Sequence, residues 1–105
     1  MTQTRKSGLF GVNDDFNEEF LSLDDLVIKH QAATFFFRAS TNQHAPEIKH
    51  GDILIVDRSC SPRSGDYVIL HHNGERSCQR WPYHPQGEIE IFGVVTANLR
   101  LMRSC

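Results

Sequence analysis

Cysteines and histidines are the side chains here that most readily act as nucleophiles or metal ligands, and the chain has three and six of them. The cysteines are Cys60, Cys78 and Cys105, an odd number without Cys-x-x-Cys spacing, so we expect reduced thiols rather than a disulfide framework. A nucleophilic pair of histidine with Cys60 or Cys78 remains open. The competing interpretation is that these thiols are small buried side chains.

The histidines do not follow the spacing of a metal site. His71 and His72 are consecutive on a predicted strand and therefore face opposite ways. His44 and His50 flank a loop that has no pair of thiols nearby. The sequence therefore predicts no metal and no cofactor, and ordinary hydrogen-bonding histidines.

Three short apolar runs predict the strands that must position these groups: Phe35–Phe37, Ile53–Val56 and Tyr67–Leu70. Each is too brief for a helix and rich in β-forming residues. Because the apolarity is continuous, we expect both faces of these strands to be covered. Asn73-Gly74 predicts a two-residue hairpin turn, after which the chain returns as a strand over Arg76–Trp81.

The last third of the chain closes the predicted domain. Pro82, Pro85 and Gly87 interrupt the chain, and Glu88–Met102 predicts one or two closing strands. Strands joined by short turns indicate a mainly β, antiparallel domain with at most one short helix.

The N-terminal part divides into two predicted segments. Residues 1–15 have few apolar positions and predict an extended or mobile arm, ahead of a β-domain over residues 16–105. Ser22 is placed to cap a short helix over Leu23–His30. The side chains expected to share a buried face of that helix are Leu23, Leu26 and Val27.

Size and charge narrow the function classes. The 105 residues suit one small domain, and a formal net charge of -2 gives no general attraction to phosphate. We therefore expect no direct nucleic-acid binding. No apolar run is long enough to span a membrane, so we expect a cytoplasmic protein.

Four stretches carry a resemblance to a known family: Ala33–Ser40, Gly51–Asp57, Gly65–Ile69 and Phe92–Val95. Their order and spacing are similar to the UmuD branch of the LexA/UmuD peptidase family, over roughly Gly8 to Arg103. The resemblance implies the family's C-terminal β-domain, a bent set of antiparallel sheets.

The resemblance also implies a serine–lysine dyad, and here the sequence departs from the family. Where the family has Gly-Asp-Ser-Met, this chain has Thr41-Asn42-Gln43-His44, and Gln79 stands at the place of the lysine. A glutamine amide neither titrates nor attacks a carbonyl. We therefore expect no peptidase activity, and a contact between the Gln43 and Gln79 amides. A peptidase with rearranged catalytic groups is the less favoured alternative.

The implied role is that of a non-catalytic accessory protein in the DNA-damage (SOS) response. Only Met1–Ser7 precede Gly8, where the self-cleaved form of UmuD begins, so we expect a mimic of that form. As a homodimer it would bind a Y-family translesion polymerase. The alternative is a decoy that heterodimerises with an active UmuD- or LexA-like protein; a RecA filament is a further possible partner.

Dimer contacts in the family involve the last strand, and an edge strand offers unpaired amides and carbonyls to a symmetric partner. The residues that would share one face of that strand are Thr96, Asn98, Arg100 and Met102. We expect these four to form the dimer interface, with a core position for Met102 as the alternative.

Overall fold

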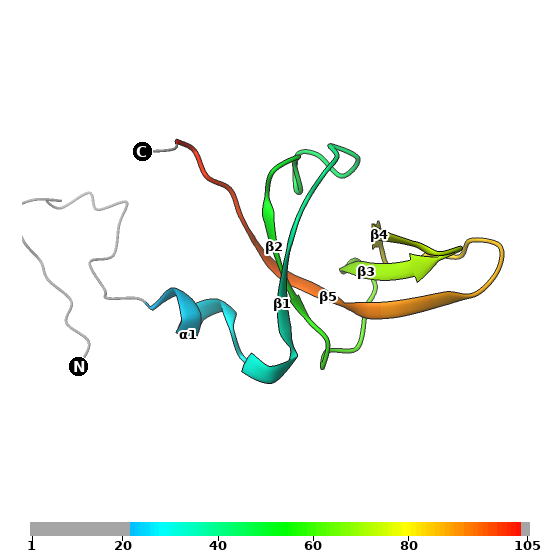
Figure 1. Cartoon of the computed structure of the whole chain (residues 1–105), viewed down its shortest axis with the longest axis horizontal. Helices are drawn as coiled ribbons and strands as arrows, with labels where there is room; N and C mark the ends of the chain where they lie inside the picture. Colours follow the sequence, from blue (N-terminus) through cyan, green and yellow to red (C-terminus); the bar gives the residue numbers. More distant parts are fainter. Residues whose placement is uncertain (1–21, 104–105) are drawn as a thin grey trace, which may run out of the picture.

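A computed structural model describes residues 22–103, and the predicted arm lies outside this part. The described chain forms one five-stranded sheet with neighbouring strands in the order β1-β2-β5-β3-β4, all antiparallel (Figure 1). The elements are α1 (Leu23–Val27), the 3-10 turn η1 (Gln31–Ala33), β1 (Thr34–Arg38), β2 (Ile53–Asp57), β3 (Tyr67–His72), β4 (Glu75–Arg80) and β5 (Ile89–Leu99). The predicted mainly β class is confirmed. None of the described helices has the length and apolarity to cross a membrane.

The core lies on β2 and β3, as their continuous apolar runs predict. Leu54 and Val56 of β2 are buried with Ile48 and Ile69, and Val68 and Leu70 of β3 are buried with Val94. Both strands are inside the sheet, because β1, β5 and β4 pair with their edges. Consecutive residues are buried in each strand, so both faces of the sheet are covered at β2 and β3.

The same expectation is wrong for β1. Phe35 is 41% exposed and Phe36 is 57% exposed, and of the three phenylalanines Phe37 is the one packed against the core cluster. β1 pairs with β2 alone and so forms an edge of the sheet. An apolar run in the sequence predicts a strand, but it does not indicate whether that strand lies in the centre of the sheet or at its edge.

The helix expectation is confirmed at its start and wrong at its end. The Ser22 hydroxyl accepts a hydrogen bond from the Asp25 backbone N–H at 3.4 Å, so Ser22 is the N-cap. The helix ends at Val27, and Ile28 is already extended. Leu23 and Leu26 are 50% and 55% exposed, and no residue of α1 is buried. The predicted buried face is therefore absent.

The β3–β4 hairpin has the predicted turn. Asn73 and Gly74 have φ of 53° and 80°, and His72 pairs with Glu75 across them. Positive φ at both central residues is the geometry that an Asn-Gly pair favours in a two-residue hairpin. The register places Val68 opposite Gln79, which fixes where β4 presents its polar side chains.

β5 joins the two halves of the sheet as one strand. Its residues 89–95 pair with β3 and its residues 94–99 pair with β2, so the strand passes from one half to the other (Figure 1). Gly93 lies at this passage, where an added Cβ would stand 2.8 Å from Val56 Cγ1. Among the described strands, none pairs with the second edge of residues 96–99.

Candidate functional site

Gln43 and Gln79 are in contact, as the sequence predicts. Gln43 lies on the loop between β1 and β2, and its Nε2 donates a hydrogen bond to Gln79 Oε1 on β4 at 3.3 Å. Gln79 Nε2 in turn donates to the Ser77 hydroxyl at 3.4 Å. The three side chains form a neutral chain of hydrogen bonds between the loop and the hairpin.

The loop is held in place by backbone and side-chain bonds at its base. Ala39 N–H donates to the Asp52 carbonyl and Gly51 N–H to the Ala39 carbonyl, both at 2.8 Å. Gly51 has a φ of 94°, a conformation that suits glycine. The Asn42 side chain accepts from His50 N–H at 2.9 Å, across the width of the loop. These bonds bring Gln43 over the hairpin.

A hollow of about 260 Å³ lies beneath this loop. Its apolar wall includes five residues of the strands and loop: Phe37, Ala39, Ile48, Leu54 and Ile69. Gln43, His44 and Ser77 supply polar groups to the same hollow. The arrangement is an apolar depression with a few convergent polar groups, which is the usual composition of a binding site.

His44 ties the loop to the hairpin beside the two glutamines. Its Nε2 donates to the Cys78 carbonyl at 2.7 Å, and its ring meets the Tyr67 ring edge to face, with centroids 5.0 Å apart. The Tyr67 hydroxyl donates to Glu47 on the same loop, and this bond raises the pKa of Tyr67. The loop is thus fastened to β3 and β4 at two points.

The thiol at this site is poorly suited to nucleophilic attack. Burial raises the pKa of Cys78 to about 11, whereas a cysteine nucleophile depends on a lowered pKa. The Gln43 and Gln79 amides do not titrate, and β4 contains no lysine. The contact between the amides can bind polar groups, but neither amide can accept a proton from a serine.

Sequence comparison assigns the family. The Peptidase S24-like family matches residues 4–93 of this chain. The chain belongs to this family. Protein SamA of Salmonella typhimurium is 34% identical over 106 residues, covering 86% of this chain and 76% of SamA. Protein ImpA of Escherichia coli is 35% identical over 100 residues (78% and 69%), and protein MucA of the same species is 27% identical over 104 residues (80% and 71%). The predicted resemblance to the LexA/UmuD family is therefore confirmed.

Three of the four residues predicted for the dimer interface bond within the S24-like domain. Asn98 Nδ2 donates to Asp52 Oδ2 at 2.9 Å, and Arg100 donates to both Asp52 oxygens at 2.8 and 2.7 Å. Thr96 Oγ1 donates to the Ile55 carbonyl at 3.3 Å. Met102 is 98% exposed, so its alternative core position is wrong. The dimer interface itself stays a prediction.

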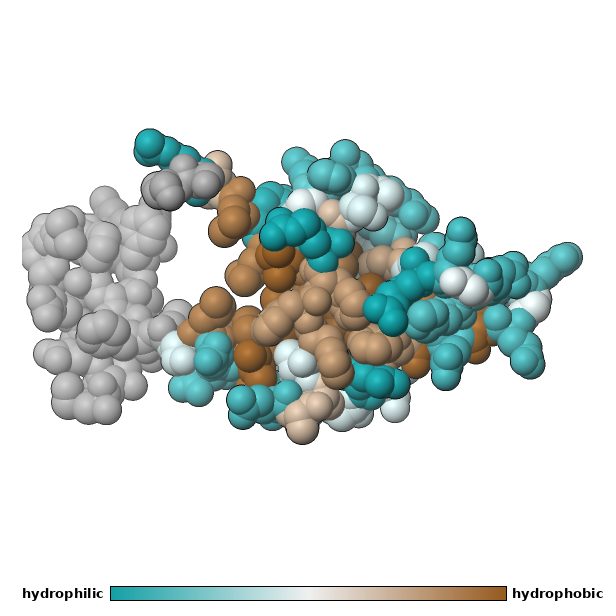
Figure 2. Space-filling model, in the orientation of Figure 1, coloured by the Kyte–Doolittle hydropathy of each residue, from teal (hydrophilic) through white to brown (hydrophobic). Residues whose placement is uncertain are grey.

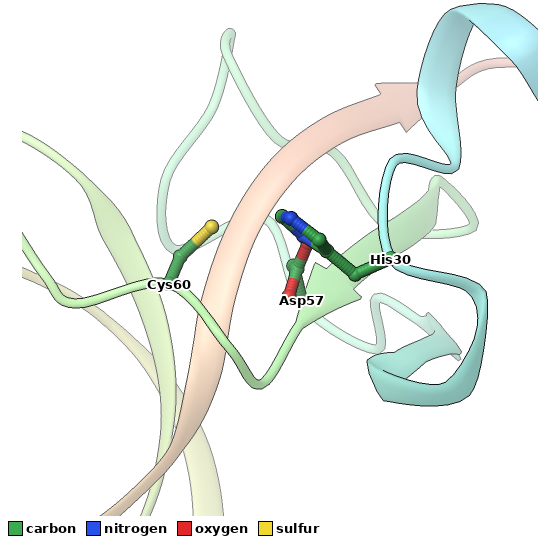
Figure 3. A group of neighbouring side chains, drawn as sticks. All are labelled: His30, Asp57 and Cys60. Atoms are coloured by element: carbon green, nitrogen blue, oxygen red, sulfur yellow. The ribbon is translucent and has the colours of Figure 1, made fainter.

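The Cys60 region of the S24-like domain contains a group that spacing did not reveal. His30, Asp57 and Cys60 each offer one donor atom, and these atoms lie within 4.8 Å of one another (Figure 3). The Ser59 hydroxyl donates to Asp57 Oδ1 at 2.5 Å, and this bond, followed by that of His30, lowers the pKa of Asp57 to about 2. Burial and the Asp57 carboxylate raise the pKa of Cys60. A Cys60 nucleophile is therefore disfavoured in this state.

Proposed function

We propose that this S24-like domain is a non-catalytic, UmuD-like accessory protein in the SOS response that binds a Y-family translesion polymerase as a homodimer. The observation that supports the loss of hydrolysis is the bond from Gln43 Nε2 to Gln79 Oε1. It joins the two positions at which the family resemblance implies the nucleophile and the base. Two amides replace a hydroxyl and an amine there, and the hydrogen bond between them joins the loop to β4.

The hollow beside the glutamines supports a binding role for the domain. Its apolar wall remains accessible below Gln43, and His44 holds the loop over it. Replacement of the serine and the lysine leaves these binding features intact, because neither the apolar wall nor the His44–Cys78 hydrogen bond involves the two replaced positions. The domain therefore keeps a surface that a partner chain can occupy.

The second candidate is a decoy that forms mixed dimers with an active UmuD- or LexA-like protein. The observation that favours it is the second edge of Thr96–Leu99, which pairs with none of the described strands. An unpaired edge accepts any strand of matching pattern, so a relative with the same last strand competes with a second copy of this chain. Both candidates use the same edge and differ in the partner.

The test is a pull-down of the tagged full chain against the host's Y-family polymerase and its UmuD-like protein, with light scattering of the eluted complexes. We expect the polymerase to elute with two copies of this chain. Elution of the UmuD-like protein as a one-to-one mixed dimer, without polymerase, would instead support the decoy. Recovery of neither protein would contradict both proposals.

A further inference from the structure

Three donor atoms of different chemical types converge at the end of β2. His30 comes from the segment between α1 and η1, Asp57 is the last residue of β2, and Cys60 follows three residues later. In Figure 3 the imidazole of His30 lies above the Asp57 carboxylate, and the Cys60 sulfur points towards the imidazole. His30 Nδ1 lies 2.6 Å from Asp57 Oδ2.

The donor set is one that suits a particular class of metal ion. Imidazole nitrogen, carboxylate oxygen and thiolate sulfur are the ligands of Zn²⁺ and similar borderline-soft divalent ions. Magnesium and calcium prefer oxygen ligands, so a thiol among the donors argues against them. Three protein ligands leave a fourth tetrahedral position for water.

The two ligands Asp57 and His30 differ in burial, so Asp57 would be the fixed ligand of a cation and His30 the one that can move. The Asp57 side chain is 6% exposed, whereas that of His30 is 56% exposed. Ser59 fixes the carboxylate through its N–H at 2.8 Å and its hydroxyl at 2.5 Å. A ligand oriented by such bonds is the usual arrangement around a protein-bound metal.

Solvent and ions reach the group from the Cys60 side. Cys60 lines a surface groove whose other walls include Pro62, Arg63, Asp66 and Thr96. On the side of the segment between α1 and η1, the half-exposed ring of His30 lies between Asp57 and solvent. The groove therefore offers an entry path that begins at Cys60.

We propose that His30, Asp57 and Cys60 bind a divalent ion of the Zn²⁺ type. In the metal-free state one proton of the His30–Asp57 hydrogen bond occupies the space between these ligands. Bonds of about 2.0–2.3 Å to the metal require the two ligand atoms to separate to roughly 3 Å or more, and exposed His30 can supply that movement.

The binding reaction balances in charge. The Cys60 thiol releases its proton to solvent, and Asp57 is already a carboxylate. The proton between His30 Nδ1 and Asp57 Oδ2 moves to His30 Nε2 through solvent, so that neutral imidazole binds through Nδ1. Two negative ligands then offset the two positive charges of the ion. The bound ion would join the segment before β1 to the end of β2, so it should also stabilise the folded chain.

The test uses Co²⁺ as a spectroscopic probe on the reduced, metal-free full chain, with Zn²⁺ as competitor. We expect a thiolate-to-cobalt charge-transfer band at one equivalent, which Zn²⁺ abolishes. Cys60→Ser should remove the band, and His30→Gln should weaken binding by about a hundredfold or more. Cys78→Ser and Cys105→Ser are the matched controls and should keep the band.

Two results would overturn the proposal. One is a wild-type chain without the band at millimolar Co²⁺; the other is a band that survives in Cys60→Ser. Thermal unfolding of each variant without metal identifies any that fails to fold, and His30→Gln, altered at a half-exposed side chain, still tests the site in that case. A melting temperature that Zn²⁺ raises in the wild type and not in His30→Gln would be independent support.

Discussion

Arg100 and Asp52 form a two-pronged ion pair that fastens the end of β5 to the loop that carries Gln43. Arg100 Nε and Nη2 donate to the two Asp52 oxygens at 2.8 and 2.7 Å, and Nη2 also donates to the Pro46 carbonyl at 3.1 Å. Asp52 is 1% exposed and accepts further bonds from Lys49 N–H and Asn98. The hydrogen bonds of Arg100 hold the pKa of Asp52 well below its usual range. The candidate site thus depends on residues far from it in sequence.

Replacing Asp52 should loosen this attachment. Asp52→Asn keeps the side-chain volume and removes the charge, so we expect the free energy of unfolding to fall by about 2 kcal/mol. Urea titration followed by fluorescence of Trp81 measures it. Asp66→Asn, at a half-buried carboxylate that accepts from Arg63 N–H, is the matched control and should cost less. An equal loss in both variants would contradict the assigned role of Asp52.

Stability should fall in acid because of Asp52 and Asp57. Both carboxyls have pKa values below the unfolded value of about 3.9, that of Asp57 at about 2. Above about pH 4 their contribution is complete; as pH falls from 4 through 2, the unfolded chain takes up protons that the folded chain does not. Chemical unfolding at a series of pH values should show this decline, and Asp57→Asn should make it shallower. A slope unchanged in that variant would argue against Asp57.

The amide contact predicts no self-cleavage. Incubation of the wild-type chain with an activated RecA filament should yield no fragment, because neither Gln43 nor Gln79 can activate an attacking hydroxyl. A fluorophosphonate probe should likewise leave the wild type unlabelled. The combined substitution Gln43→Ser and Gln79→Lys should permit labelling at position 43. A wild-type fragment, or a single wild-type residue labelled by this or a thiol-reactive probe, would revive the peptidase alternative.

The predicted dimer interface needs a variant that spares the Asp52 ion pair. Arg100→Asp would place a like charge beside Asp52, so a loss of dimer would not separate folding from association. Met102 is 98% exposed, and Met102→Asp should shift the light-scattering mass towards the monomer at unchanged thermal stability. Leu26→Asp, at an exposed position on α1, is the control and should leave the mass unchanged. Equal masses in both variants would move the interface away from the end of β5.

Local pattern determined the parts of this protein that short-range chemistry controls. The apolar runs of β2 and β3 became the buried strands, Asn73-Gly74 formed the hairpin turn, and Ser22 capped the helix. The absence of serine at 43 and lysine at 79 was also readable from sequence, since it concerns residue identity and not placement.

The tertiary structure decided what depends on which strands become neighbours. Phe35 and Phe36 are exposed because β1 lies at the edge of the sheet, although their run has the same apolar character as β2. His30 meets Asp57 from 27 positions away because β1 pairs antiparallel with β2, which brings the start of one strand beside the end of the other. Spacing along the chain reveals ligand sets that share one turn or hairpin, so a set assembled by strand pairing escapes it.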